Sequence, residues 1–216
     1  MKINKLLLTA FALTTLLVSC QKEVDLQDLN NPGGGGNNGG GNNGSIQGTW
    51  KFVGMDGVLS QELKAGSGVD EEKILTSYVF TSFNNKGTVT IDASNFISSG
   101  IGYSIDTTVH TEFYIGGDLL DSLDTDFQFD TPLSSGSVKY RAVGSDSIYL
   151  DQGFITLDPS AGGGDPMATI PAGYKIEWSG DTLILKTRVI DKHTEITNGV
   201  TAYVSNDVAQ VVKLKK

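Results

Sequence analysis

The stretch that decides the fold is IGYSIDTTVHTEFYI, residues 101–115. Its odd positions carry mostly apolar side chains, and its even positions from 104 to 112 carry polar ones. Successive side chains of a β-strand point to opposite faces of the sheet, so one face of this strand should be buried and the other wet. A half-buried strand of this kind is typical of an antiparallel sheet.

The same two-residue period recurs along the chain. Strands are expected at residues 50–53, 75–83, 88–92, 138–143, 147–150, 174–178, 182–190 and 208–214. Turn residues separate several of them, as in NNKG at 84–87, which is expected to close a hairpin with a positive φ at Gly87. We predict an all-β, antiparallel up-and-down β-barrel, with a β-sandwich as the alternative. Residues 69–76 are the one helix candidate, and residues 116–136 and 158–172 are predicted to be long loops.

The first predicted strand opens with Gly48-Thr49-Trp50. This motif resembles the Gly-x-Trp opening of lipocalins and of lipocalin-like lipoproteins of Bacteroidetes, and residues 83–91 and 174–185 look like hairpins of that family. The resemblance implies a lipocalin-like barrel over residues 46–216, with Gly48 and Trp50 at its closed base. Lipocalins often pack an arginine from near the last strand against this tryptophan. Here the last strand carries Lys213 and Lys215, and Arg188 lies one strand earlier.

The amino terminus has the pattern of a signal peptide. Lys2 and Lys5 precede an apolar run that ends in Leu-Val-Ser-Cys at residues 17–20. The run is too short to cross a bilayer, which needs about 20 residues. Its end resembles the lipobox of bacterial lipoproteins, which implies cleavage after residue 19 and diacylglycerol on Cys20. Cys20 is the only cysteine of the chain, and the alternative is an ordinary secretory signal with a chance cysteine.

Residues 20–45 are expected to form a lipidated terminus and a flexible linker, because 31–44 read NPGGGGNNGGGNNG. QKEVD at 21–25 looks like the signal that sends lipoproteins of Bacteroidetes to the outer face of the outer membrane. The expected location is therefore the outer membrane, anchored by lipid and exposed at the cell surface. If 21–25 are merely a solvated stretch, the periplasmic face is the alternative.

An eight-stranded barrel is either filled by side chains or holds one small apolar ligand. The candidate ligand-binding residues are those expected to point inward: Tyr103, Ile105, Val109, Phe113, Tyr140, Tyr174, Ile176 and Trp178. An ordinary packed core is the alternative interpretation of the same residues. A surface interaction or glycan-binding module on a sandwich is the alternative function.

Other chemistries are not favoured. The formal charge of −9 becomes −11 when Lys2 and Lys5 leave with the signal peptide, which disfavours nucleic acid as a partner. The two histidines, His110 on a polar strand face and His193 in an expected turn, form no HExxH motif, and no Gly-x-Ser-x-Gly elbow is present. We therefore expect no enzyme activity, no metal and no cofactor; protein partners stay unspecified. Five aspartates fit a solvated loop better than a calcium site: Asp118, Asp121, Asp124, Asp126 and Asp130.

Overall fold

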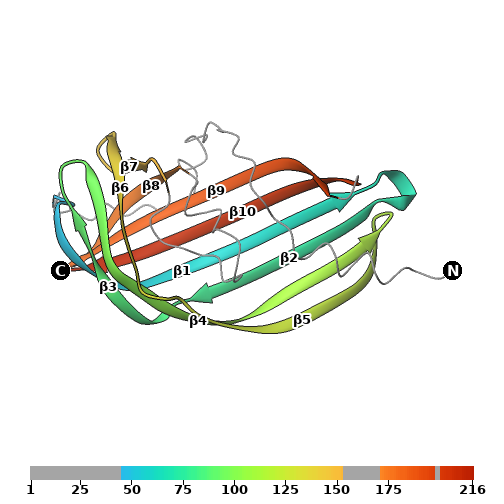
Figure 1. Cartoon of the computed structure of the whole chain (residues 1–216), viewed down its shortest axis with the longest axis horizontal. Helices are drawn as coiled ribbons and strands as arrows, with labels where there is room; N and C mark the ends of the chain where they lie inside the picture. The colour runs from blue at the N-terminus through green and yellow to red at the C-terminus, as the bar shows by residue number, and fades with distance from the viewer. Residues whose placement is uncertain (1–44, 153–170, 198–199) are drawn as a thin grey trace.

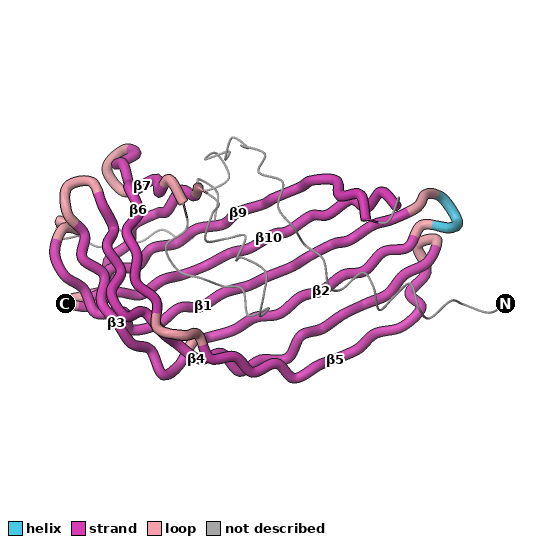
Figure 2. The backbone as a smooth tube through the Cα atoms, viewed as in Figure 1, coloured by secondary structure: helices cyan, strands magenta, loops and turns pink. Residues whose placement is uncertain are grey.

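A computed structural model describes residues 45–152, 171–197 and 200–216. The predicted signal peptide, Cys20 and the glycine-rich linker lie outside these residues, as does most of the predicted loop at 158–172. The described chain is almost entirely antiparallel strand (Figures 1 and 2). The strands are β1 Gly48–Ala65, β2 Glu72–Thr81, β3 Phe83–Ile91, β4 Asn95–Ile115, β5 Asp118–Asp130, β6 Ser134–Val143, β7 Ser147–Leu150, β8 Ala172–Ser179, β9 Thr182–Thr197 and β10 Val200–Lys215. The all-β, antiparallel prediction is confirmed.

The strands close into a ring at one end of the molecule. Around the ring, β1 pairs with β3, β3 with β4, β4 with β6, and then β7, β8, β9 and β10 follow in order. Pairing of β10 with β1 completes the circle. All strands belong to one sheet, which favours the barrel over the sandwich of two packed sheets.

The ring is not an even barrel. Four strands of the ring, β1, β4, β9 and β10, continue past it and, together with β2 and β5, form an open, curved sheet in the order β5-β4-β2-β1-β10-β9 (Figure 1). Strands β7 and β8 are too short to follow them, since β7 has 4 residues while β9 and β10 have 16 each. Among the described residues, β5 and the far part of β9 are therefore the two edges of the open sheet.

The chain path is nevertheless up and down. Strands β2 and β3 both run antiparallel to β1, one along each half of it. Strands β5 and β6 relate to β4 in the same way. The predicted hairpin at residues 84–87 is therefore wrong: this stretch lies within β3, where the register with β4 shifts twice, although Gly87 has the expected positive φ, of 97°.

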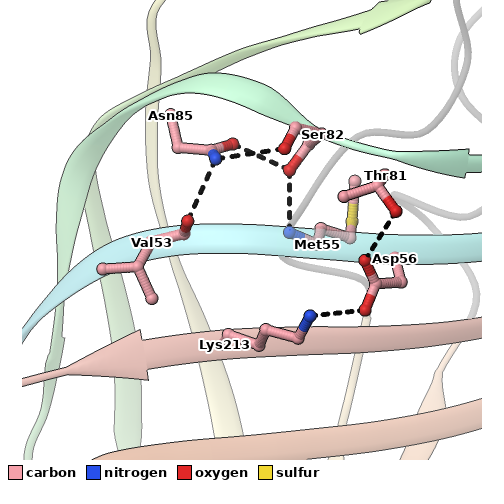
Figure 3. A network of polar contacts seen from close by, with 7 residues as sticks. All are labelled: Val53, Met55, Asp56, Thr81, Ser82, Asn85 and Lys213. Atoms are coloured by element: carbon pink, nitrogen blue, oxygen red, sulfur yellow. Dashed lines mark hydrogen bonds and ion pairs between the residues drawn. The ribbon is translucent and has the colours of Figure 1, made fainter.

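Buried Ser82 lies at the break between β2 and β3, and its hydrogen bonds stabilise the chain there (Figure 3). The amide N of Ser82 donates to the carbonyl of Met55 at 2.8 Å, and the Ser82 hydroxyl accepts from the Met55 amide at 2.7 Å. The same hydroxyl donates to Asn85, whose side-chain amide donates to the carbonyl of Val53 at 3.0 Å. Side chains thus satisfy backbone groups that the irregularity removes from the ladder, and buried polar groups need such partners.

Bulges change which sequence positions face the core. In β1 the register shifts between Phe52 and Gly54, so the inward positions are even up to Phe52 and odd from Met55 onward. In β4 a shift after Ser98 has the same effect around Gly100, whose φ is +60°. A bulge inserts one residue and so reverses the alternation beyond it.

The closed end is filled by its own side chains. Its fully buried residues come from all parts of the ring, and the largest are Trp50, Tyr174, Phe52, Phe96 and Met55. Burying a side chain of this size contributes about 1.5–3 kcal/mol, so this core is the main source of stability. Packing by ordinary core residues is therefore the correct interpretation of this end of the molecule.

Two other local predictions are wrong. The helix candidate at 69–76 is a single 3₁₀ turn, Gly68–Asp70, followed by β2, whose residues pair with β1 and β4 on both sides. The predicted loop at 116–136 contains β5, which pairs with β4 along most of its length. In both cases the cross-strand partner stabilises an extended conformation that the local composition does not favour.

Gly87 gives a direct test of the close approach between β3 and β4. A Cβ built on Gly87 would lie 2.5 Å from the carbonyl oxygen of Gly100, and its φ of +97° already disfavours other residues. Gly87→Ala should cost well over the roughly 1–2 kcal/mol of left-handed strain alone, measured by urea unfolding. Gly144→Ala is the control, because its φ is +71° but no atom lies within 4 Å of the added Cβ. Equal losses for the two variants would contradict the packing.

Candidate functional site

The candidate site is the inner face of the open sheet, the face whose side chains continue the rows of the buried core. Cross-strand register defines these rows. The row at the margin of the core contains buried Val208 and Val189 with partly buried Leu59 and Tyr78. A later row contains Leu63, Ile74 and Phe113 with Val204, which is buried. Leu59, Leu63, Ile74 and Phe113 are only half-buried in the described structure.

All eight predicted ligand-binding residues lie on the inner side, but they fall into three groups. Tyr103, Ile105 and Tyr174 are buried in the closed core. Tyr140, Ile176 and Trp178 are partly buried and pack against that core at its rim. Only Val109 and Phe113 lie on the open sheet, half-buried. The inner side also carries residues that the sequence analysis did not select: partly buried Leu59, Leu63, Ile74 and Tyr78, exposed Ile115 and Leu123, and buried Val189, Val204 and Val208.

Two surface hollows lie elsewhere. One, of about 580 Å³, is lined by Lys86, Ser104 and Asp130 at the break between β2 and β3. The other, of about 290 Å³, lies near Tyr140 and Ile176 at the closed end. Neither brings the predicted residues together as one pocket.

The predicted base motif is buried at the closed end. Trp50 is 1% exposed; its indole N–H donates to the carbonyl of Ile46 at 2.8 Å, and its ring centroid lies 5.7 Å from that of Trp178. Gly48 begins β1 with a φ of +134°. The cation over the Trp50 ring is Lys216, with its Nζ 4.8 Å from the ring centroid. The sequence analysis missed Lys216, because only the cross-strand geometry shows which terminal lysine reaches the ring.

The other basic residues considered for that role have different partners. Lys213 forms an ion pair with Asp56 on the outer face (Figure 3). Arg188 donates two hydrogen bonds to Asp207, at 2.8 and 2.6 Å. Lys215 lies 3.3 Å from a carboxylate oxygen of Asp181.

Polar side chains interrupt the apolar inner face along β9 and β10. Next to the core, Thr187 and Gln210 form a buried cross-strand pair. The Thr187 hydroxyl has no hydrogen-bond partner among the described residues. In a later row the Gln61 side-chain amide donates to the Asn206 side-chain oxygen at 2.8 Å. A buried hydroxyl without a partner costs free energy that a bound polar group could recover.

His193 lies on this face and not in a turn, which corrects the prediction. It is part of β9, opposite Val204 of β10. Its Nδ1 lies 2.6 Å from a carboxylate oxygen of Asp191, and its Nε2 lies 3.0 Å from one of Glu195. Partial burial lowers the pKa of His193, but the hydrogen bonds to Glu195 and Asp191 outweigh it, so the pKa lies above its usual value.

This arrangement predicts a pH-dependent contribution to stability. A histidine whose pKa is raised by folding stabilises the protein below its unfolded pKa of about 6.5 and loses this contribution as the pH rises through its folded pKa. The difference in Tm between wild type and His193→Gln should therefore be larger at about pH 5.5 than at about pH 9. The exposed His110 is present in both proteins and cancels in the difference. A difference that grows with pH would contradict the ion pairs of His193.

The five aspartates of the predicted loop belong to β5 instead. Asp124 and Asp126 point to the outer face, where Asp124 lies 2.6 Å from Nδ1 of His110. His110 is on the polar face of its strand, as predicted, and its pKa is raised by hydrogen bonds to Asp124 and Glu112. The described residues contain no group of three or more metal-ligating side chains.

No protein-family model, curated protein or solved structure matches this chain. None of the helical structure that the described residues form is long and apolar enough to cross a membrane. The function must therefore be argued from the inner face and from the sequence.

Proposed function

We propose that this protein is a lipid-anchored lipoprotein of the outer membrane whose lipocalin-like sheet domain binds a small apolar molecule on its inner face. The observation that carries the ligand is the half-exposed apolar surface of the open sheet, including Leu59, Leu63, Ile74, Val109 and Phe113. These side chains share one face across three adjacent strands. A contiguous, partly exposed apolar face of this kind is typical of a binding site.

The filled closed end supports this proposal. It anchors one end of β1, β4, β9 and β10 around a packed core, so the open sheet does not need a ligand to fold. A binding surface placed on rigid strands loses little conformational entropy on association. A ligand would extend the core by one layer along the inner rows.

The anchor is supported by the sequence. The lipobox-like residues 17–20, the single cysteine and the glycine-rich tract up to residue 44 together fit a domain tethered at a membrane surface. One acyl chain holds a protein only marginally, whereas two or three hold it stably. The charged residues at 21–25 favour the cell-surface side of the outer membrane.

The alternative, a surface interaction or glycan-binding module, has less support. Glycan platforms need exposed aromatic rings on one face. The exposed outer aromatics are scattered, with Phe83 on β3 and Tyr203 on β10, while Tyr114 is covered by Lys73, 3.7 Å from its ring centroid.

The ligand site can be tested with decanol, a neutral apolar probe. Calorimetric titration uses the chain without residues 1–19 and with Cys20→Ser, so that no detergent competes. We expect saturable binding that Val109→Asp weakens at least about tenfold, which is about 1.4 kcal/mol. Val79→Asp is the matched control, because Val79 is exposed on the outer face. Equal weakening by the two variants, or no saturable binding by the parent protein, would rule out the inner face as the site.

A further inference from the structure

The ionisable side chains of the open sheet are divided unequally between its two faces. Every lysine and arginine of its six strands alternates with the inner positions and therefore lies on the outer face: Lys51, Lys64, Lys73, Lys186, Arg188, Lys192, Lys213 and Lys215. The inner rows carry five carboxylates and one histidine: Glu72, Asp118, Asp121, Asp191, His193 and Glu195. The apolar inner face therefore has an acidic border.

The carboxylates stand on opposite sides of the apolar rows. Asp191 and Glu195 flank His193 on β9 at one edge of the sheet. Glu72 on β2 and Asp121 on β5 lie towards the other edge, and both are exposed. Even with His193 protonated, the charge of this border is negative. A charge that is partly shielded from water interacts more strongly with these carboxylates than a charge in bulk solvent does.

A second observation points to a ligand with a polar group. The Thr187 hydroxyl is buried on the same face, 4% exposed at the residue level, and has no hydrogen-bond partner among the described residues. It lies beside Gln210, which contacts the sulfur of Met55. A hydroxyl can accept a hydrogen bond from an N–H donor as well as donate one.

We propose that the ligand is an amphipathic cation, an apolar chain that carries a protonated amine. This inference rests on the proposed function and specifies its ligand class. The chain packs along the inner rows of β1, β2 and β10, and the ammonium group is stabilised by the negative potential of the border carboxylates, which lie on both sides of these rows. A fatty acid of the same length places its carboxylate against groups of the same sign, and its binding is disfavoured.

Three probes of equal chain length separate charge from apolar burial: decylamine, decanol and decanoate. Each is titrated at neutral pH, below its micelle concentration, into the Cys20→Ser protein. We expect decylamine to bind at least about tenfold more tightly than decanoate, with decanol between them. This preference should decrease as salt is added, because salt screens the border charges.

A matched pair of variants tests where the preference originates. The inner variant removes four of the five border carboxylates by Glu72→Gln, Asp121→Asn, Asp191→Asn and Glu195→Gln. The outer variant removes the same formal charge by Asp106→Asn, Glu112→Gln, Asp124→Asn and Asp126→Asn, all on the outer face. The ratio of decylamine to decanoate affinity should fall towards one in the inner variant and persist in the outer variant.

The outcomes distinguish the two proposals. If decanol binds and decanoate binds as tightly as decylamine, the cation inference is wrong and the apolar site stands. If the outer variant loses the preference as fully as the inner one, net charge is responsible and the inference is also wrong. If none of the probes binds, the proposed function fails and the inference with it. Should the inner variant not fold, Glu72→Gln with Asp121→Asn, both exposed, should lower the same ratio, and an unchanged ratio contradicts the inference.

Discussion

Cys20→Ser should abolish incorporation of labelled palmitate and release the protein from the membrane fraction. The thiol of Cys20 is the attachment point for diacylglycerol in the lipobox interpretation, and serine cannot form the thioether. No other cysteine in the chain can replace it. Each buried methylene contributes about 0.8 kcal/mol to membrane binding, so loss of two or three acyl chains removes the whole anchor. The measurement is metabolic labelling followed by sedimentation of membranes.

Ser19→Ala is the matched control, because it changes the neighbouring residue to another small one and keeps the thiol. This variant should be labelled and should sediment with membranes like the wild type. Label in the Cys20→Ser protein, or its retention in washed membranes, would contradict the lipid anchor.

Trp50→Ala should destabilise the domain by about 3–5 kcal/mol, the range for a large aromatic residue removed from a core. Trp50 closes the filled end of the ring, where it contacts Trp178, donates to the carbonyl of Ile46 and lies beneath the ammonium of Lys216. Removing the indole ring leaves a cavity in the buried core of the closed end. The measurement is urea unfolding of the Cys20→Ser protein followed by circular dichroism.

Val58→Ala is the control for Trp50→Ala. Val58 lies on the same strand but on the outer face, 48% exposed, so its truncation should change the unfolding free energy by no more than about 0.5 kcal/mol. A loss below about 1 kcal/mol for Trp50→Ala would mean that the closed end is not the stabilising core.

The strands and their buried faces followed from sequence wherever the two-residue alternation was continuous. Residues 101–115 are the clearest case, since Ile105, Val109 and Phe113 all lie on the inner side of β4. This worked because alternation is a direct consequence of strand geometry. Trp50, which the alternation places on the inner side of the first strand, is buried at the closed end.

The features of the fold that the sequence did not predict depend on neighbouring strands that are distant in sequence. Residues 118–130 look like a loop because they are rich in aspartate, and only pairing with β4 shows that the aspartates belong to an edge strand. Aspartate on an exposed edge also opposes unwanted strand pairing, so its presence is compatible with a strand. His193 was misplaced for the same reason: the DKHT sequence reads as a turn, but β10 pairs with it along the whole of β9.

The candidate site was only partly visible in the sequence. The eight predicted residues share the correct face, but the closure of the ring buries three of them and leaves two on the open sheet. The sheet is open beyond the closed end because β7 and β8 are short. The local sequence of these two strands does not indicate which inner-facing residues of the other strands stay uncovered. The acidic border could not be predicted from the sequence, because only the cross-strand register assigns each carboxylate to an inner row.

The most direct test of the account is protection of the inner face by a ligand, measured with single cysteines. In the Cys20→Ser background the chain has no cysteine, so Val109→Cys places one thiol on the inner face and Val79→Cys places one on the outer face. Decanol at ten times its Kd should slow maleimide modification of the inner thiol about tenfold and leave the outer thiol unaffected. An inner thiol that reacts at the same rate with and without saturating decanol would contradict the account.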